Sequence, residues 1–187
     1  MINTGDIKRG VAVEVDGTLY QVVEVHHVKT KKSAVYKVKL RDLRAGHIIE
    51  RTFNAGEKLT AARVERRDMQ YLYGDADALT FMNTQTYDQV AVPRGIAGDA
   101  LSYIKEGDVI AVVTHGEEAI GIELPASVAL KIARSDPGVK GDTATGATKR
   151  ATLETGLEVD VPLFINEGDT IKVSTSTGGY IERTANV

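Results

Sequence analysis

An alternation of apolar and polar residues with a period of two runs along almost the whole chain and limits the folds available to it. Successive side chains of a β-strand point to opposite sides, so this pattern marks strands with one buried face. Two such runs in residues 11–25 flank Asp16-Gly17, a pair that favours a type I′ hairpin turn because that turn needs positive φ at both positions. We place one short helix near residues 98–107. The sequence therefore predicts an all-β fold.

The alternation stops and restarts twice, which divides the chain into three predicted β domains. We place them at residues 1–63, 64–126 and 127–187. The second and third domains contain similar segments, EGDVIAV at 106–112 and EGDTIKV at 167–173, which share five of seven residues. This echo favours two related five-stranded barrels of the oligonucleotide-binding (OB) type behind an N-terminal β domain.

Positive charge is concentrated in one part of a chain whose net charge is −3. Residues 26–41, HHVKTKKSAVYKVKLR, contain six Lys or Arg and no acid. The first predicted domain has 12 basic and 7 acidic residues (+5), the second has 4 and 11 (−7), and the third has 7 and 8 (−1). Clustered lysines at a hairpin tip repel one another unless a phosphate backbone neutralises them. The first domain is therefore predicted to approach a polyanion. Protection of a strand edge is the alternative for Lys37 and Lys39.

Composition also indicates the compartment. The chain has no cysteine, which excludes disulfides and thiolate metal sites and fits a reducing environment. No run of about 18 apolar residues suggests a membrane span. The first residues, MINTGDIKRG, lack the apolar stretch of a secretory signal. We expect a cytoplasmic protein without a membrane segment.

The histidines do not form a metal-binding pattern. His26 and His27 are adjacent on a predicted strand, so their side chains point to opposite faces. His47 and His115 supply no clear third ligand. The sequence therefore predicts no metal site.

A glycine-rich segment imitates a phosphate-binding loop without completing it. In GVKGDTATGATKR (138–150), Ala147-Thr148 stands where such a loop requires Lys followed by Ser or Thr. No Ser-His-Asp order or pair of carboxylates has a recognisable catalytic setting. We expect no nucleotide, no cofactor and no enzymatic activity.

The third domain contains a more specific pattern. Residues 149–169, KRATLETGLEVDVPLFINEGD, resemble the signature of the bacterial elongation factor P family. The segments DPGVKGDTATG, RTFNAGEKL, MQYLY and FMNTQTYDQ are also similar to that family, so the resemblance covers essentially the full length. The matching signature positions are Lys149, Ala151, Gly156, Val159, Val161, Pro162, Ile165, Gly168 and Asp169.

The resemblance implies a fold and a function. The fold is an SH3-like (KOW-type) N-terminal β domain followed by two OB barrels, with an L-shaped outline similar to that of tRNA. The family binds the ribosome between the P and E sites and relieves stalling at consecutive prolines. It does so by positioning the CCA end of the peptidyl-tRNA in the P site. The implied partners are the ribosome, peptidyl-tRNA and rRNA, and we expect a monomer.

The resemblance also implies which basic residues act. The family carries its key basic residue at the tip of an N-terminal hairpin, which falls on Lys32 here. The tip is one residue shorter than usual and lacks flanking glycine, so Lys31 is the alternative. A modifying enzyme extends this lysine in many members. We expect Lys29, Lys31, Lys37 and Lys39 to contact rRNA and tRNA backbones.

A loop of the third domain is the second implied site. In the family a matching loop lies near the mRNA codon in the E site. Small and hydroxyl-bearing residues permit close approach to RNA and hydrogen bonds with it. A tight turn capped by Asp142 is the alternative reading. The residues concerned are Gly141, Asp142, Thr143, Thr145 and Gly146.

Two other functions fit parts of the pattern. The first is an elongation-factor-P-like paralogue, which the glycine-poor tip keeps open. The second is a general OB-fold RNA-binding module, which usually stacks bases on exposed aromatic side chains. Phe, Tyr and Trp make up only 5% of this chain, which disfavours the general module.

Overall fold

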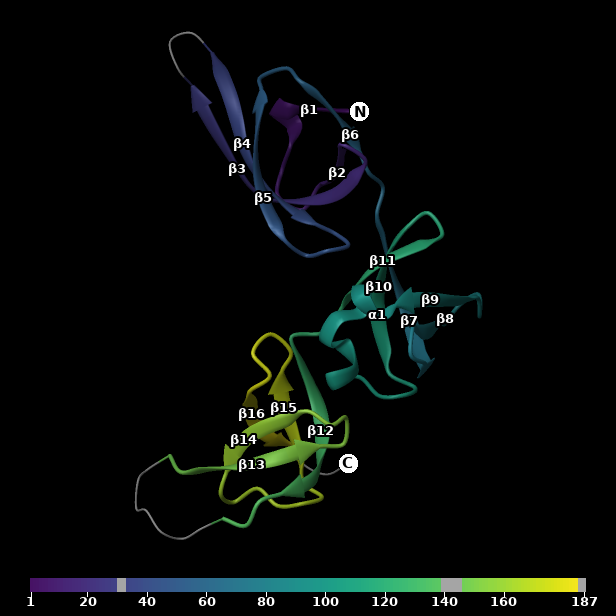
Figure 1. The fold of residues 1–187 in the computed structure, drawn as a ribbon, viewed down its shortest axis with the longest axis vertical. Coiled ribbons are helices and arrows are strands. Elements are labelled where there is room, and N and C mark those ends of the chain that lie inside the picture. The colour runs from purple at the N-terminus through teal and green to yellow at the C-terminus, as the bar shows by residue number, and fades with distance from the viewer. Residues whose placement is uncertain (30–32, 139–145, 185–187) are drawn as a thin grey trace.

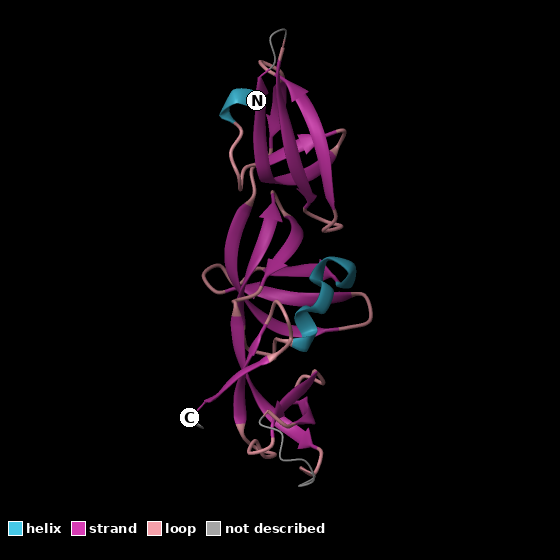
Figure 2. Cartoon of the chain, turned by 90° about the vertical axis from the view of Figure 1, so that its left-hand side faces the viewer, coloured by secondary structure: helices cyan, strands magenta, loops and turns pink. Residues whose placement is uncertain are grey.

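The computed structural model describes residues 1–29, 33–138 and 146–184. Its strands form three antiparallel sheets, and Figure 2 shows that helical segments are few and short. The all-β prediction is confirmed. Within the described residues there is no helix with the length and apolar character that a membrane crossing requires.

The first β unit is a six-stranded sheet in the order β1-β6-β2-β3-β4-β5. Asp16 and Gly17 have φ values of 51° and 77°, which confirms the type I′ turn between β2 and β3. Val13, Val38 and Leu40 are buried in its core. The elements are β1 (Ile2–Asn3), η1 (Thr4–Asp6), β2 (Ala12–Val15), β3 (Thr18–Lys29), β4 (Ala34–Asp42), β5 (Ile48–Asn54) and β6 (Lys58–Ala61).

The second β unit is a five-stranded sheet in the order β11-β10-β7-β8-β9. Its first strand, β7, is central and changes register with β8 between Tyr71 and Tyr73. Such a bulge bends a strand so that it can contribute to a closed or partly closed barrel. The elements are β7 (Glu65–Gly74), β8 (Ala78–Asn83), β9 (Gln89–Pro93), α1 (Arg94–Ala97), η2 (Gly98–Ser102), β10 (Val109–His115) and β11 (Glu118–Glu123).

The helical segment of this unit lies earlier than predicted. Helical turns cover residues 94–102, whereas the sequence pattern placed a helix near 98–107. Pro93 precedes the first turn, where its fixed φ and missing N–H suit a helix start. Gly98 has φ of 56° and ends the α-helical turn.

The third β unit repeats the topology of the second. Its order, β14-β13-β12-β15-β16, places the first of its five strands between the second and the fourth, as in the second unit. Its first strand also changes register with the next one, here between Ile132 and Arg134. The strands are β12 (Ser127–Ser135), β13 (Thr148–Leu153), β14 (Glu158–Pro162), β15 (Thr170–Ser174) and β16 (Tyr180–Thr184).

The two EGD segments form the same turn in the two units. Gly107 and Gly168 have φ of 92° and 88°. Each glycine N–H donates to a carbonyl of the unit's first strand, at 2.8 Å and 3.0 Å. The carboxylates of Asp108 and Asp169 accept the N–H three residues earlier, at 2.8 Å and 2.9 Å. The shared turn and strand order support an internal duplication.

The three units follow one another along an elongated, bent outline. Figure 1 places the first unit at one end, the third at the other, and the second to one side of the line between them. This outline agrees with the L shape that the family resemblance implies. The ends of β3 and β4 that lie farthest from the second unit are at one extreme of the molecule (Figure 1).

A small apolar cluster joins the first and second units. Leu19 of β3 packs with Val113 of β10 and Ile120 of β11, and Leu43 and Val64 pack against them. Burial of such side chains is the main source of favourable energy at a contact of this kind. The turn after β4 therefore anchors the first unit to the second.

Polar contacts position that turn. The carboxylate of Asp42 accepts the backbone N–H groups of Arg44 and Ala45 at 2.7 Å and 2.8 Å. Arg44 Nη2 in turn donates to Glu118 Oε2 at 2.9 Å, across the two units. Asp42 thus fixes the turn that delivers Arg44 and Leu43 to the junction.

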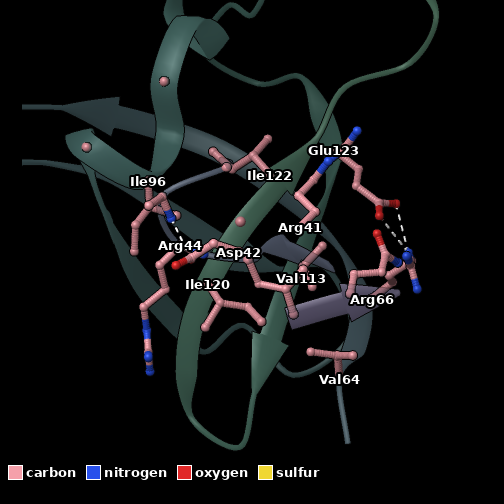
Figure 3. Close-up of a pocket in the computed structure, with 17 residues that line it drawn as sticks. Arg41, Asp42, Arg44, Val64, Arg66, Ile96, Val113, Ile120, Ile122 and Glu123 are labelled. Atoms are coloured by element: carbon pink, nitrogen blue, oxygen red, sulfur yellow. Dashed lines mark hydrogen bonds and ion pairs between the residues drawn. The ribbon is translucent and has the colours of Figure 1, made fainter. Parts of the chain in front are cut away.

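A cleft of about 350 Å³ opens beside the junction. Figure 3 shows Arg41 and Asp42 of the first unit at its wall together with Ile122 of the second. The Arg66–Glu123 ion pair, with Nε 2.8 Å from both carboxylate oxygens, closes one side. The two charged groups on that side of the cleft, those of Arg66 and Glu123, are therefore paired with each other within the second unit.

The second and third units are also in direct contact. Tyr103 of the second unit is buried in the apolar core of the third. Thr155 Oγ1 donates to the carbonyl oxygen of Ser102 at 2.7 Å. Lys105 Nζ lies 3.2 Å from Glu154 Oε1. Apolar and polar contacts therefore combine at this junction as well.

We predict that the apolar cluster, and not the ion pair, holds the first and second units together. Ile120→Ala should lower the free energy of unfolding by about 2–5 kcal/mol, because it leaves a cavity in a buried site. Arg44→Ala should cost less than about 1 kcal/mol, because it removes an exposed ion pair. Urea unfolding measures both, and a larger loss for Arg44→Ala would contradict this ranking.

Candidate nucleic-acid interface

The β3–β4 hairpin is the most extended feature of the first unit. Its strands pair from Tyr20 with Asp42 to Lys29 with Ala34. Residues of β3 beyond Val22 pair with β4 and with no other strand in the described part of the sheet. The outer half of β3 is therefore a free edge at one extreme of the molecule (Figure 1).

The two faces of this hairpin differ in chemistry. On one face, Glu24 lies opposite Lys39 and His26 lies opposite Lys37. On the other, Val25 and the buried Val38 face the core. Lys37 and Lys39 thus alternate with the buried Val38 and Leu40 of β4, in keeping with the period-two pattern of the sequence.

The predicted lysines are not equivalent in their surroundings. Lys29 and Lys37 are exposed, and within the described residues neither has an acidic partner. Lys39 Nζ lies 2.6 Å from Glu24 Oε2. Lys31 and Lys32, the alternatives for the tip residue, lie outside the described residues.

Glu24 is the centre of a small charged cluster. Its other carboxylate oxygen lies 2.7 Å from His26 Nε2. The hydrogen bond from Lys39, followed by that from His26, lowers the pKa of Glu24, and the same bond raises the pKa of Lys39. Because the pKa of Glu24 is lowered in the folded state, the contribution of this cluster to folding stability is fully present at neutral pH. That contribution is lost as the pH falls through the lowered pKa. At neutral pH, Glu24 therefore offsets part of the positive charge of the hairpin.

A stacked pair of rings lies on the core-facing side of the hairpin. His27 is opposite Tyr36, with ring centroids 4.4 Å apart and an interplanar angle of 3°. The sequence pattern raised His27 only as a candidate metal ligand and gave no local signal for this pair. No group of three or more His, Asp or Glu side chains in the described ranges could hold a metal ion.

The third unit has a longer connection than the second between its first two strands. Its first two strands are joined by residues 136–147, whereas residues 75–77 suffice in the second unit. The Asp136 N–H donates to the carbonyl oxygen of Arg150 at 2.9 Å and anchors the base of the longer connection. Gly146 is exposed with φ of 107°. The other predicted loop residues, Gly141, Asp142, Thr143 and Thr145, lie outside the described residues.

Three family models match the chain in order along its length. The KOW-like domain of elongation factor P matches residues 3–59, its OB domain matches 64–122, and its C-terminal domain matches 128–183. The chain belongs to the elongation factor P family. The SH3-like and OB folds that the resemblance implied are confirmed, and the chain is a translation elongation factor of this family.

Individual relatives agree with the family models. Proteins named elongation factor P from Moorella thermoacetica and Pelotomaculum thermopropionicum are 53% and 50% identical over 184 residues. Each alignment covers 98% of this chain and 100% of the relative.

A solved structure named eukaryotic translation initiation factor 5A from Methanococcus jannaschii aligns with a TM-score of 0.49 at 21% identity. That alignment covers 65% of this chain and 94% of the solved one.

We predict that Glu24 weakens the attraction of the hairpin for RNA. Glu24→Gln should tighten binding to ribosomes and steepen the slope of log K against log salt by up to about 0.7–0.9, because Lys39 becomes available to one more phosphate. Co-sedimentation over a salt series measures this slope.

Asp16→Asn is the matched control, because it removes the same charge at the other end of β3. Asp16 pairs with Arg51 at 3.0 Å, away from the outer end of the hairpin. Equal slopes for Glu24→Gln and Asp16→Asn would contradict a specific role of Glu24, because they would show that only the total charge of the protein determines its attraction to RNA.

Proposed function

We propose that this elongation factor P family member binds the ribosome between the P and E sites and promotes peptide-bond formation at consecutive prolines. The β3–β4 hairpin carries the proposal, because it projects at one end of the molecule and bears exposed Lys29 and Lys37. Membership of the family supports the same reading. The ribosome and the peptidyl-tRNA in the P site are the proposed partners, and the cytoplasm is the proposed location.

The hairpin tip acts by positioning. Residues 30–33 connect the paired ends Lys29 and Ala34, and they include both candidate tip lysines. Lys32, or Lys31 in the alternative register, contacts the CCA end of the P-site tRNA. A lysine ammonium is a compact cation that donates to phosphate and ribose oxygens. Holding a flexible reactant in reactive geometry lowers the entropic part of the barrier without an acid, base or nucleophile from the protein.

The charge distribution supports this orientation. The first predicted domain carries +5 and the second −7, so the hairpin end is the part attracted to RNA phosphates. Contacts to phosphates fix position without reading sequence. Lys29 and Lys37 therefore hold the hairpin on rRNA or tRNA, while the tip lysine acts on the CCA end.

The long connection of the third unit is the proposed second contact. The corresponding connection of the second unit is short, so the barrel fold itself does not need the extra residues of 136–147. Asp142, Thr143 and Thr145 carry groups that hydrogen-bond to bases or ribose hydroxyls. Gly141 and Gly146 permit close approach of the backbone. We assign this loop to the mRNA codon in the E site.

Lys32→Ala should abolish most of the rescue of a Pro-Pro-Pro reporter in translation, because it removes the positioning cation. Lys31→Ala should have that effect instead if the alternative register holds. Lys58→Ala, an exposed lysine of the same unit, is the control and should retain full rescue. Undiminished rescue by both tip variants would remove the tip from the mechanism.

The same tip residue is the proposed target of a modifying enzyme. An intact-mass measurement on the native protein, followed by a tryptic map, assigns any added mass to Lys32, to Lys31 or to neither. A mass on one of them would also fix the register of the shortened tip.

Joint replacement of Asp142 and Thr143 by Ala should weaken ribosome binding about thirtyfold, because it removes two contacts of about 1 kcal/mol each. Thr177→Ala, in a turn of the same unit, should leave ribosome binding unchanged. Affinity for ribosomes with and without mRNA in the E site provides the measurement. Equal affinity of the double variant and the unaltered protein would favour a purely structural turn.

A further inference from the structure

The stacked pair of His27 and Tyr36 is a feature that the proposed function does not use. The two rings are nearly parallel, with an interplanar angle of 3° and centroids 4.4 Å apart. They lie opposite each other across β3 and β4, two residues inward from the paired ends at Lys29 and Ala34. The pair is therefore close to the outer end of the hairpin.

Tyr36 is the fixed member of the pair. Its side chain is half-buried and packs against the core of the first unit, and the buried Phe53 of β5 is its partner on the other side. Its hydroxyl lies against Gly5, 3.6 Å from the position that a Cβ would occupy. The Tyr36 ring therefore extends the core toward the hairpin edge.

His27 is the exposed member. It lies on the free edge of β3. Among the described residues its imidazole forms no hydrogen bond or ion pair, and its ring contacts no ring other than that of Tyr36. One of its ring faces is covered by Tyr36, which holds the imidazole plane in a fixed orientation.

A flat ring beside a cation matches the chemistry of a nucleobase and its phosphate. Unpaired bases stack on aromatic and histidine side chains, and lysine neutralises the adjoining phosphate. Lys29 is exposed two residues further along β3, and alternate residues of a strand share a face. It therefore lies on the same side as His27, where it can meet that phosphate.

We propose that the exposed ring of His27, supported by Tyr36, is a stacking platform for one unpaired RNA base, with Lys29 on the adjoining phosphate. The proposal rests on the proposed function, because ribosome-bound RNA is the source of the base. That RNA is either the P-site tRNA or rRNA, and both sources present the same chemistry.

The test compares three variants in ribosome binding. His27→Ala should weaken affinity about tenfold, which is the order of magnitude of one lost base stack. His27→Phe should keep affinity within about twofold, because it retains a flat ring. His26→Ala is the matched control on the opposite face of the same strand and should also stay within about twofold.

Two arms of the experiment distinguish the sources of the base. Ribosomes carrying P-site tRNA are compared with vacant ribosomes. If His27→Ala loses affinity only for ribosomes that carry P-site tRNA, the base belongs to the tRNA. If it loses affinity equally for both kinds of ribosome, the base belongs to rRNA. Equal affinity of His27→Ala and the unaltered protein in both arms would overturn the proposal.

A fourth variant separates stacking from the integrity of the hairpin. His27→Val keeps a strand-forming residue but has no flat ring. It should bind as weakly as His27→Ala while amide hydrogen exchange at Tyr36 and Val38 stays as slow as in the unaltered protein. Full affinity of His27→Val, or His27→Phe binding as weakly as His27→Ala, would also overturn the platform. Failure of the unaltered protein to bind ribosomes would instead overturn the proposed function, and the platform with it.

Discussion

Continuous pairing of β3 with β4 is the constraint on which the rest of the structure depends. The pairing starts beside the junction with the second unit, at Tyr20 and Asp42, and ends at Lys29 and Ala34. Because both strands belong to one ladder, the charged face, the stacked rings and the paired ends at Lys29 and Ala34 are held in one frame. A flexible loop of the same composition would have to lose far more conformational entropy on binding RNA.

The second and third units share one barrel framework but join its first two strands differently. Both have the same strand order, a register change in their first strand and the same Gly-Asp turn. In the second unit the first two strands are joined tightly at 75–77, and in the third by residues 136–147. The helical turns at 94–102 belong to the second unit. The duplicated framework supplies a rigid base, and the longer connection of the third unit lies where that unit is proposed to meet RNA.

Much of the fold could be predicted from the sequence, because period-two alternation and the Asp16-Gly17 turn are local signals. The cross-strand partners of β3 and β4 could not be predicted, because they depend on a bulge. The register of β3 and β4 shifts between Val22 and Glu24. Without that shift, Glu24 would lie opposite Val38 and His26 opposite Tyr36. The extra residue turns Glu24 outward to Lys39 and places His27, not His26, on Tyr36. The predicted helix overlaps the helical turns only at residues 98–102, because Pro93, and not apolar spacing, sets where those turns begin.

Strand β4 also connects the junction with the second unit to the outer end of the hairpin. One end, at Asp42, is fixed by the turn that meets Val113 and Ile120, and the other end reaches the tip at Ala34. At about 3.3 Å per residue, the arm is roughly 26 Å long. A tilt of about 10° at its pivot would swing the far end by about 4–5 Å, close to the spacing between neighbouring strands. The position of Lys29 and Ala34, and with it the contact proposed with RNA, is thus governed by the junction with the second unit at the opposite end of β4.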